Sequence, residues 1–180
     1  MNRQTQLFDL VRNKKPKHVI EIGTWTGKRA LEFMAVSNCY YTGFDLFEDA
    51  TPEINKAELN AKRPSSIASV GKAIEQAGFN KFCLIRGNTH ETLPDYFSSM
   101  YGSWEPFDFA YIDGGHSIAT MENDYRWITQ NIEEGGTIIL NGWYDPQPEG
   151  FGCNFIDGEV LPSTDKKWGK YDIHLLKVDK

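Results

Sequence analysis

Residues 19–34 read VIEIGTWTGKRALEFM. This stretch begins as a short apolar run, is interrupted by Gly23 and Gly27, and resumes with apolar residues at helical spacing. Short apolar runs are typical of buried parallel strands, and glycine permits the tight turn between such a strand and a helix. The stretch therefore predicts a strand, a turn and a helix, either as a simple tight connection or as a place where backbone approaches a small charged ligand.

Strand and helix patterns alternate along the remainder of the chain. Helical spacing of apolar residues occurs at 5–13, from a Thr26 N-cap to Met34, at 65–77 and at 118–132. Strand-like apolar runs lie at 17–22, 39–46, 81–86, 107–112 and 137–140, and a looser alternation lies at 170–178. This order predicts an α/β fold: a Rossmann-like, doubly wound, mainly parallel sheet with helices on both faces and an antiparallel C-terminal edge strand.

Length and composition indicate one globular domain spanning residues 1–180, since a 40% hydrophobic content over this length supports a single core. Segment 47–64 is polar and contains two prolines, which predicts a flexible excursion within that domain.

The formal net charge of −6 provides no basic face for nucleic acid. No apolar run approaches the roughly 18 residues of a membrane span. The three widely spaced cysteines are predicted to be buried thiols. We expect a cytoplasmic protein without nucleic-acid or membrane partners.

Polar and glycine residues follow each predicted strand. In parallel sheets, ligands bind beyond the carboxyl ends of the strands, near the point where strand order reverses. Candidate site residues are therefore expected at 21–27, 45–46, 87–89, 113–116 and 141–143.

The first of these segments does not match a dinucleotide fingerprint. A G-x-G-x-x-G motif would need glycines at positions that here hold Gly23, Trp25 and Lys28. Trp25 would block the approach of a pyrophosphate, so an NAD-linked enzyme is disfavoured. Asp45 ends the second predicted strand, 22 residues beyond Gly23, where its two carboxylate oxygens match the vicinal diol of a ribose.

The combination of E-x-G-x-x-x-G at 21–27 with Asp45 in TGFDLF resembles the class I S-adenosylmethionine-dependent methyltransferases. The resemblance covers about residues 17–143 and implies S-adenosyl-L-methionine as the cofactor. Its implied cofactor-binding residues are Glu21, Gly23, Thr24, Trp25, Thr26, Gly27, Asp45, Leu46, Asn88 and Asp113.

The stretch FDFAYIDGGHSIATMENDYRWI at 107–128 is the most specific motif of the chain. Its ID-G-x-H core resembles the O-methyltransferases that act on sugars of natural products and related hydroxylated compounds. In that branch the aspartate lies beside the cofactor and the histidine is the general base, roles that the resemblance implies for Asp113 and His116. Alternatively, Asp113 caps a helix that begins near Ser117, and His116 has a structural role on its first turn.

The chain departs from that branch after the fifth predicted strand. Members of the branch carry two consecutive aspartates there, which complete a divalent metal site, whereas this chain has Asn141-Gly142. Asp113 and Asn141 alone would hold Mg²⁺ weakly, and it is open whether the nearby Asp145 points inward. No metal-binding residue is assigned, and a magnesium ion is doubtful.

Segment 47–64 and the Gly-, Pro- and aromatic-rich segment 141–155 are expected to decide the acceptor, a small hydroxylated molecule. The aromatic side chains there either stack on the acceptor or cover the last strands: Trp143, Tyr144, Phe151 and Phe155.

Among the other histidines, His18 and His174 are predicted to be structural or solvated, and His90 could contact the ligand. A homo-oligomer would supply further covering segments. The rival hypothesis is a catalytically degenerate protein that binds S-adenosylmethionine without transferring its methyl group.

Overall fold

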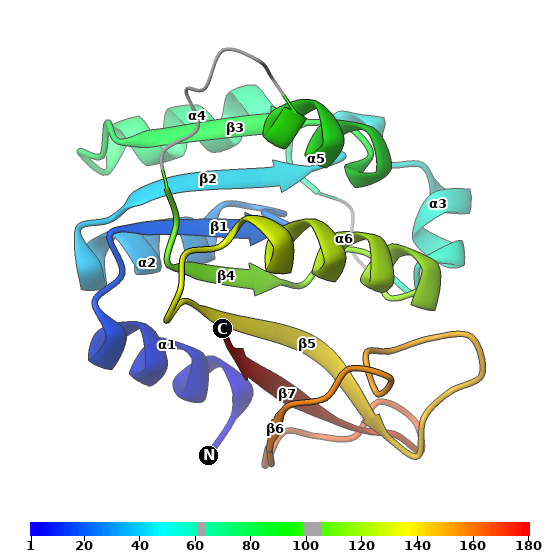
Figure 1. Ribbon diagram of the computed structural model, residues 1–180. Coiled ribbons are helices and arrows are strands. Elements are labelled where there is room, and N and C mark those ends of the chain that lie inside the picture. The colour runs from blue at the N-terminus through cyan, green and yellow to red at the C-terminus, as the bar shows by residue number, and fades with distance from the viewer. Residues whose placement is uncertain (61–63, 99–105) are drawn as a thin grey trace.

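The computed structural model describes residues 1–60, 64–98 and 106–180, and in these residues seven strands form one sheet (Figure 1). The strand order is β3-β2-β1-β4-β5-β7-β6. The bounds are β1 (His18–Ile22), β2 (Tyr40–Asp45), β3 (Phe82–Arg86), β4 (Phe109–Ile112), β5 (Thr137–Asp145), β6 (Glu159–Leu161) and β7 (Asp172–Asp179). The pairings among β1 to β5 are parallel, whereas β7 runs antiparallel to both β5 and β6. The predicted α/β fold with a mainly parallel sheet is confirmed.

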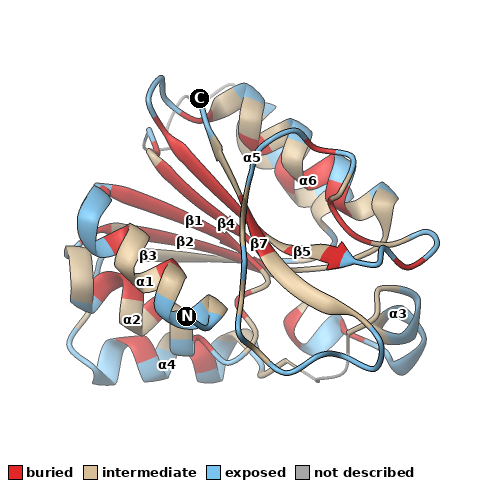
Figure 2. Cartoon of the chain, turned by 90° about the horizontal axis from the view of Figure 1, so that it is seen from below, coloured by how far each residue is buried: buried red, intermediate tan, exposed pale blue. Residues whose placement is uncertain are grey.

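Helices cover both faces of the sheet, as Figures 1 and 2 show from two directions. On one face lie α1 (Arg3–Lys14), α2 (Lys28–Ser37) and α4 (Ile67–Gln76), and on the other lie α5 (Thr89–Ser98) and α6 (Ile118–Asn131). Each face has its own apolar cluster, one built around Phe33 and the other around Met121. The strands lie between these clusters: β1, β2, β4 and β5 are mostly buried, whereas β3, β6 and β7 are mostly half-buried. Chain order reverses between β1 and β4, which makes the carboxyl ends of these two strands the expected ligand crevice.

Segment 47–64 is more ordered than its composition predicts. It contains a 3₁₀ turn, η1 (Phe47–Asp49), and a short helix, α3 (Pro52–Ala57), while residues 61–63 lie outside the described part. Thr51 caps α3 by accepting a hydrogen bond from the Ile54 backbone N–H, and Pro52 occupies the first turn, where no intrahelical N–H bond is lost. The proline read as a sign of irregular chain therefore begins a helix.

Three further expectations about the elements are wrong. Thr26 does not cap α2, because the N-cap is Gly27 at φ +74°. Helix α5 was not expected, since its first turn is polar and Pro94 lies inside it. The C-terminal strand β7 is antiparallel as predicted but is not the edge strand, because the three-residue β6 pairs along its outer side.

Two of the three cysteines, Cys39 and Cys153, are buried free thiols as predicted, whereas Cys83 is half-buried. Within the described ranges, the search for helices long and apolar enough to cross a bilayer finds none.

Gly27 is required by packing between helices. A Cβ at this position would lie 2.7 Å from Cγ1 of Val70 in α4, and the backbone there is left-handed. Gly78 has a comparable φ of +89°, yet nothing lies within 4 Å of its notional Cβ. Alanine at Gly27 would therefore be destabilised by overpacking and by the left-handed backbone, whereas alanine at Gly78 would be destabilised by the backbone alone.

Gly27→Ala is expected to lower the free energy of unfolding by about 2–4 kcal/mol, because it adds overpacking to left-handed strain. Gly78→Ala is expected to cost only the strain, about 1–2 kcal/mol. Urea denaturation of both variants measures the difference. Equal losses would contradict the assigned contact with Val70.

Candidate active site

A cavity of about 400 Å³ lies at the carboxyl ends of the parallel strands. Its walls come from the turns after β1, β2, β3 and β4, from α3 and the residues that follow it, and from Arg3 and Asn141. The predicted site residues that line it are Gly23, Trp25, Asp45, Leu46, Asn88, Asp113 and His116. The tertiary structure thus brings most of the predicted site together, in a volume suited to a small molecule.

Gly23 allows the backbone after β1 to meet the backbone after β4. A Cβ on Gly23 would lie 2.2 Å from the carbonyl oxygen of Asp113, a separation that no side chain tolerates. The Asp113 N–H also donates to the Ile22 carbonyl oxygen at 2.8 Å. Besides lining the cavity, this glycine therefore serves a backbone–backbone approach, which the sequence pattern alone did not distinguish from an approach to ligand.

Asp45 shapes the turn in which it lies. Its Oδ2 accepts the Trp25 backbone N–H at 2.7 Å, and its Oδ1 accepts the Phe47 backbone N–H at 2.8 Å. Trp25 and Phe47 both have positive φ, an uncommon conformation for such large side chains that these hydrogen bonds help to hold. Burial raises the pKa of Asp45, and the two N–H groups oppose that effect. Each carboxylate oxygen retains a second lone pair with which to accept a ligand hydroxyl.

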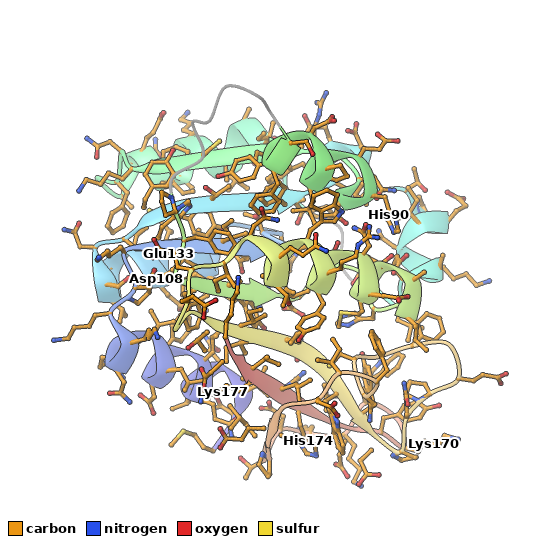
Figure 3. The ribbon with its side chains drawn as sticks, in the orientation of Figure 1. His90, Asp108, Glu133, Lys170, His174 and Lys177 are labelled. Atoms are coloured by element: carbon orange, nitrogen blue, oxygen red, sulfur yellow. The ribbon has the colours of Figure 1, made fainter. Side chains whose placement is uncertain are left out.

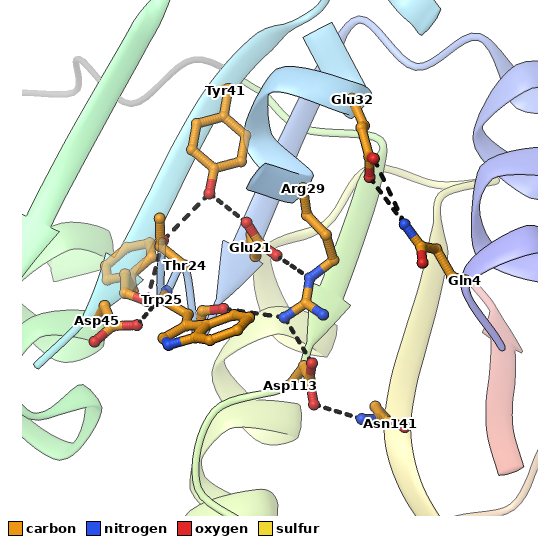
Figure 4. A network of polar contacts seen from close by, with 12 residues as sticks. Gln4, Glu21, Thr24, Trp25, Arg29, Glu32, Tyr41, Asp45, Asp113 and Asn141 are labelled. Atoms are coloured by element: carbon orange, nitrogen blue, oxygen red, sulfur yellow. Dashed lines mark hydrogen bonds and ion pairs between the residues drawn. The ribbon is translucent and has the colours of Figure 1, made fainter. Parts of the chain in front are cut away.

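A half-buried guanidinium connects β1 to the turn after β4 (Figure 4). Arg29 in α2 donates from Nε to Glu21 Oε1 at 2.8 Å, and its Nη2 lies 2.6 Å from Asp113 Oδ2. The same guanidinium lies over the Tyr111 ring, 4.9 Å from its centroid. Burial disfavours the charged form of Arg29, but the neighbouring Asp113 and Glu21 carboxylates more than compensate and raise its pKa.

Glu21 lies beneath the cavity and does not line it. The side chain is fully buried and accepts hydrogen bonds from Arg29 and from the Tyr41 hydroxyl, the latter at 2.5 Å. Burial raises the pKa of Glu21 to about 7, although Arg29 and Tyr41 both oppose the rise. Glu21 therefore cannot make the direct contact with a cofactor in the cavity that was predicted for it. It influences the cavity through its ion pair with Arg29.

Three other predicted cofactor residues also lie outside this cavity. Thr24 is buried and its hydroxyl lies 3.2 Å from the Tyr41 hydroxyl. Thr24 and the exposed Thr26 line a second cavity of about 400 Å³ between α1 and α2. The two cavities share Arg3, Trp25, Arg29 and Asn141 as lining residues. Gly27 faces Val70 instead.

His116 lies on the wall of the first cavity, immediately before α6. Its Nε2 is 3.8 Å from Asp113 Oδ1, and its Nδ1 is buried without a hydrogen-bond partner. Burial lowers the pKa of His116, whereas Asp113 and Glu58 act to raise it. The neutral imidazole is therefore the dominant form at neutral pH, and Nε2 is the nitrogen able to meet a ligand. The N-cap of α6 is Ser117, so the expectation that Asp113 caps this helix is wrong.

Glu58 fastens segment 47–64 over the site. Its carboxylate accepts the backbone N–H and hydroxyl of Ser117 and the hydroxyl of Thr120, at 2.8–3.1 Å. The backbone carbonyl oxygen of Glu58 also accepts a hydrogen bond from the backbone N–H of His116. A carboxylate at the N-terminus of α6 is favoured by the helix dipole. This contact holds α3 and the next few residues as one wall of the cavity.

The aromatic side chains of segment 141–155 belong to the cover of the last strands. Trp143 packs on His174, with ring centroids 5.6 Å apart, and Tyr144 is buried edge-on to His116. None of the four aromatic candidates lines either cavity, and only Asn141 of this segment does. The packing of Trp143 and Tyr144 thus agrees with the covering alternative, and the stacking alternative stays untested.

The remaining histidines do not line the first cavity, although His90 follows its lining residue Thr89. His90 is exposed near the start of α5, and His174 lies on β7 and accepts a hydrogen bond from the Ser163 N–H (Figure 3). His18 is buried, with Nε2 2.9 Å from the Thr42 hydroxyl, in agreement with the structural role predicted for it. The potential contact of His90 with ligand finds no support, because His90 does not line the cavity.

The sequence interpretation missed several lining residues: Arg3, Arg29, Asn55, Glu58 and Asn60. Arg29 carried the only usable signal, since an arginine two positions after Gly27 lies close to the buried Glu21 of the preceding strand. Asn55, Glu58 and Asn60 belong to segment 47–64, which was expected to help decide the acceptor although none of its residues was singled out. Arg3 comes from α1, and no local pattern indicated that it reaches the cavity.

Comparison with known proteins agrees with this architecture. The family model described as "Methyltransferase domain" matches residues 20–143, which is more than half of the chain. A search of the curated proteins found no match.

Solved structures of low sequence identity share the fold. The O-methyltransferase TomG from Streptomyces achromogenes, solved with S-adenosylmethionine, is 13% identical, with a TM-score of 0.66 and coverage of 97% of this chain and 78% of TomG. An O-methyltransferase from Bacillus cereus, solved with S-adenosylhomocysteine, is 18% identical, with a TM-score of 0.65 and coverage of 97% and 79%. A Staphylococcus aureus protein classed with caffeoyl-CoA O-methyltransferases is 19% identical, with a TM-score of 0.57, and 78% of this chain spans only 57% of its length.

The family match covers the strands, the turns and the central helices that build most of the cavity, which confirms the resemblance to methyltransferases drawn from residues 21–27 and Asp45. The chain belongs to the methyltransferase domain family.

Proposed function

We propose that this protein is an S-adenosylmethionine-dependent methyltransferase that methylates a hydroxyl group of a small hydroxylated acceptor. The observation that carries the proposal is the single cavity into which Gly23, Asp45 and His116 all open, in a chain of the methyltransferase family. We further propose that residues 1–180 form one catalytic domain that works in the cytoplasm.

The half of the cavity next to β1, β2 and β3 suits the cofactor. Asp45 supplies two oxygens for the ribose diol, and Asn88, which follows β3, is available beside the adenine. Two structural neighbours were solved with S-adenosylmethionine or S-adenosylhomocysteine, which supports the same ligand here. Gly23 and Asp113 would hold the remainder of the cofactor, which would supply the methyl group there.

The half formed by α3 and the residues after it suits the acceptor. Asn55, Glu58 and Asn60 from this segment line the cavity together with Arg3 and Asn141. Amide and charged side chains recognise hydroxyl groups by hydrogen bonding, and none of the described lining residues in this part of the wall is aromatic. These residues favour a polyhydroxylated acceptor over a flat aromatic one.

Methyl transfer to an alcohol requires alignment of the hydroxyl and removal of its proton. S-Adenosylmethionine, when bound, supplies a methyl group on a sulfonium, and the new O–C bond forms as the S–C bond breaks and its electron pair returns to sulfur. His116 accepts the hydroxyl proton at Nε2. Asp113, 3.8 Å away, stabilises the imidazolium that results.

Asp45→Asn is expected to weaken the binding of S-adenosylhomocysteine at least about tenfold, because one charge-assisted hydrogen bond to the ribose is worth about 1.5–3 kcal/mol. The control is Asp49→Asn, the same substitution four residues away, at an exposed carboxylate that pairs with Arg86 outside the cavity. Isothermal titration calorimetry of the wild type and both variants provides the measurement. Absence of heat with folded wild-type protein would refute the proposed cofactor.

His116→Ala is expected to abolish methylation of the acceptor while S-adenosylhomocysteine still binds, with His90→Ala as the inert control. The acceptor itself would come from a screen of hydroxylated metabolites with radiolabelled cofactor. A screen without turnover, despite tight binding, would favour the degenerate binding protein.

Turnover is expected to fall at low pH, where His116 becomes protonated and can no longer accept a proton. Burial lowers the pKa of His116 below its usual value of 6.5, so the neutral base persists to a lower pH than a solvated histidine would allow. Turnover is therefore expected to be constant from pH 8 down to about 6.5 and to fall only below it. A rate that already declines between pH 8 and 7 would be inconsistent with His116 as the base.

A further inference from the structure

We infer that this site works without a divalent metal ion, and that the guanidinium of Arg29 is its resident cation. The inference rests on the proposed methyltransferase function and concerns the same cavity. The branch that the 107–128 motif resembles binds a metal through its first aspartate and a later acidic pair. The side chains at the matching positions of this chain are already bound to one another.

Both carboxylate oxygens of Asp113 are engaged (Figure 4). Oδ2 lies 2.6 Å from Nη2 of Arg29, and Oδ1 accepts a hydrogen bond from Nδ2 of Asn141 at 2.5 Å. Mg²⁺ needs several oxygen ligands at about 2.1 Å, and a guanidinium on the same carboxylate both occupies the oxygen and repels the ion.

The positions of the acidic pair offer no replacement ligand. The amide oxygen of Asn141 accepts a hydrogen bond from Nη1 of Arg3 at 2.7 Å, so a second guanidinium lies next to the site. A Cβ at Gly142 would lie 2.9 Å from Cε of Met121 and 3.0 Å from Nδ1 of His116. The imidazole and the methionine therefore fill the space that a carboxylate at position 142 would need.

The other carboxylates nearby do not compensate. Asp145 is exposed and lies outside the cavity, and Glu58 is bound to the N-terminus of α6. Among the described residues, no group of three or more His, Cys, Asp or Glu side chains is placed to hold a metal ion. The polar side chains of this site thus form hydrogen bonds and ion pairs with one another, and two of them are guanidinium groups.

Arg29 acts through Asp113 and is a positioning residue. By joining the buried Glu21 to Asp113, it fixes the carboxylate whose other oxygen lies 3.8 Å from Nε2 of His116. Alignment of the acceptor hydroxyl in this site then depends on hydrogen bonds from side chains and on the imidazole.

The direct test is titration of the wild-type protein with Mn²⁺, followed by electron paramagnetic resonance, with and without S-adenosylhomocysteine. We expect no saturable site up to about 1 mM, the weak end of biological dication sites. Binding of one Mn²⁺ per chain in the wild type that is lost in Asp113→Asn would overturn the inference. Mn²⁺ binding that the variant retains would take place at another site and would agree with the inference. Calorimetry with S-adenosylhomocysteine on the same sample reports on the proposed function separately.

A second test uses the conservative pair Arg29→Lys and Arg29→Met in the methylation assay. Lysine keeps the charge and is expected to retain turnover within about tenfold of wild type, whereas methionine is expected to lose about 100-fold. Turnover of the wild type in a chelator is expected to stay within twofold. Equal activity of the two variants, or a loss in chelator that Mg²⁺ restores, would contradict the inference.

Discussion

The half-buried guanidinium of Arg29 links the two strands between which the chain order reverses. A charge removed from water must be paired, and Arg29 finds its partners on β1, through Glu21, and after β4, through Asp113. The same two strand ends meet through the bare backbone of Gly23. Since the cavity opens at this junction, its floor is fixed by an ion-pair network and a steric contact rather than by a bound ligand.

A second constraint closes the cavity from the other side. Glu58 carries segment 47–64 onto the N-terminus of α6, directly beside His116. The turns after the first three strands then face the predicted cofactor, and the segment that follows β2 faces the predicted acceptor. In the proposed function, the helical segment that Glu58 anchors serves as the acceptor wall.

The proposed chemistry follows from charge and burial at three side chains. Asp45 is held by two backbone N–H groups and keeps lone pairs for a ribose, and His116 stays neutral because it is buried. Asp113 is shared between Arg29 and Asn141, which commits it to orientation rather than to metal binding. Nε2 of His116, the proposed base, lies 3.8 Å from Oδ1 of this oriented carboxylate.

The sequence by itself determined the alternation of strands and helices, the parallel sheet, and the turns that carry Gly23, Asp45 and His116, because apolar periodicity and glycine positions are local properties. It did not reveal β6, α5 or the helix at Pro52, where capping or a polar turn outweighs the apolar pattern. Only the tertiary structure decided that Glu21 lies beneath the site, that Gly27 serves packing on Val70, and that Arg3 and Glu58 complete the walls. The physical reason is that these roles depend on contacts between segments far apart in the chain, and such contacts leave no periodic trace in the residues that make them.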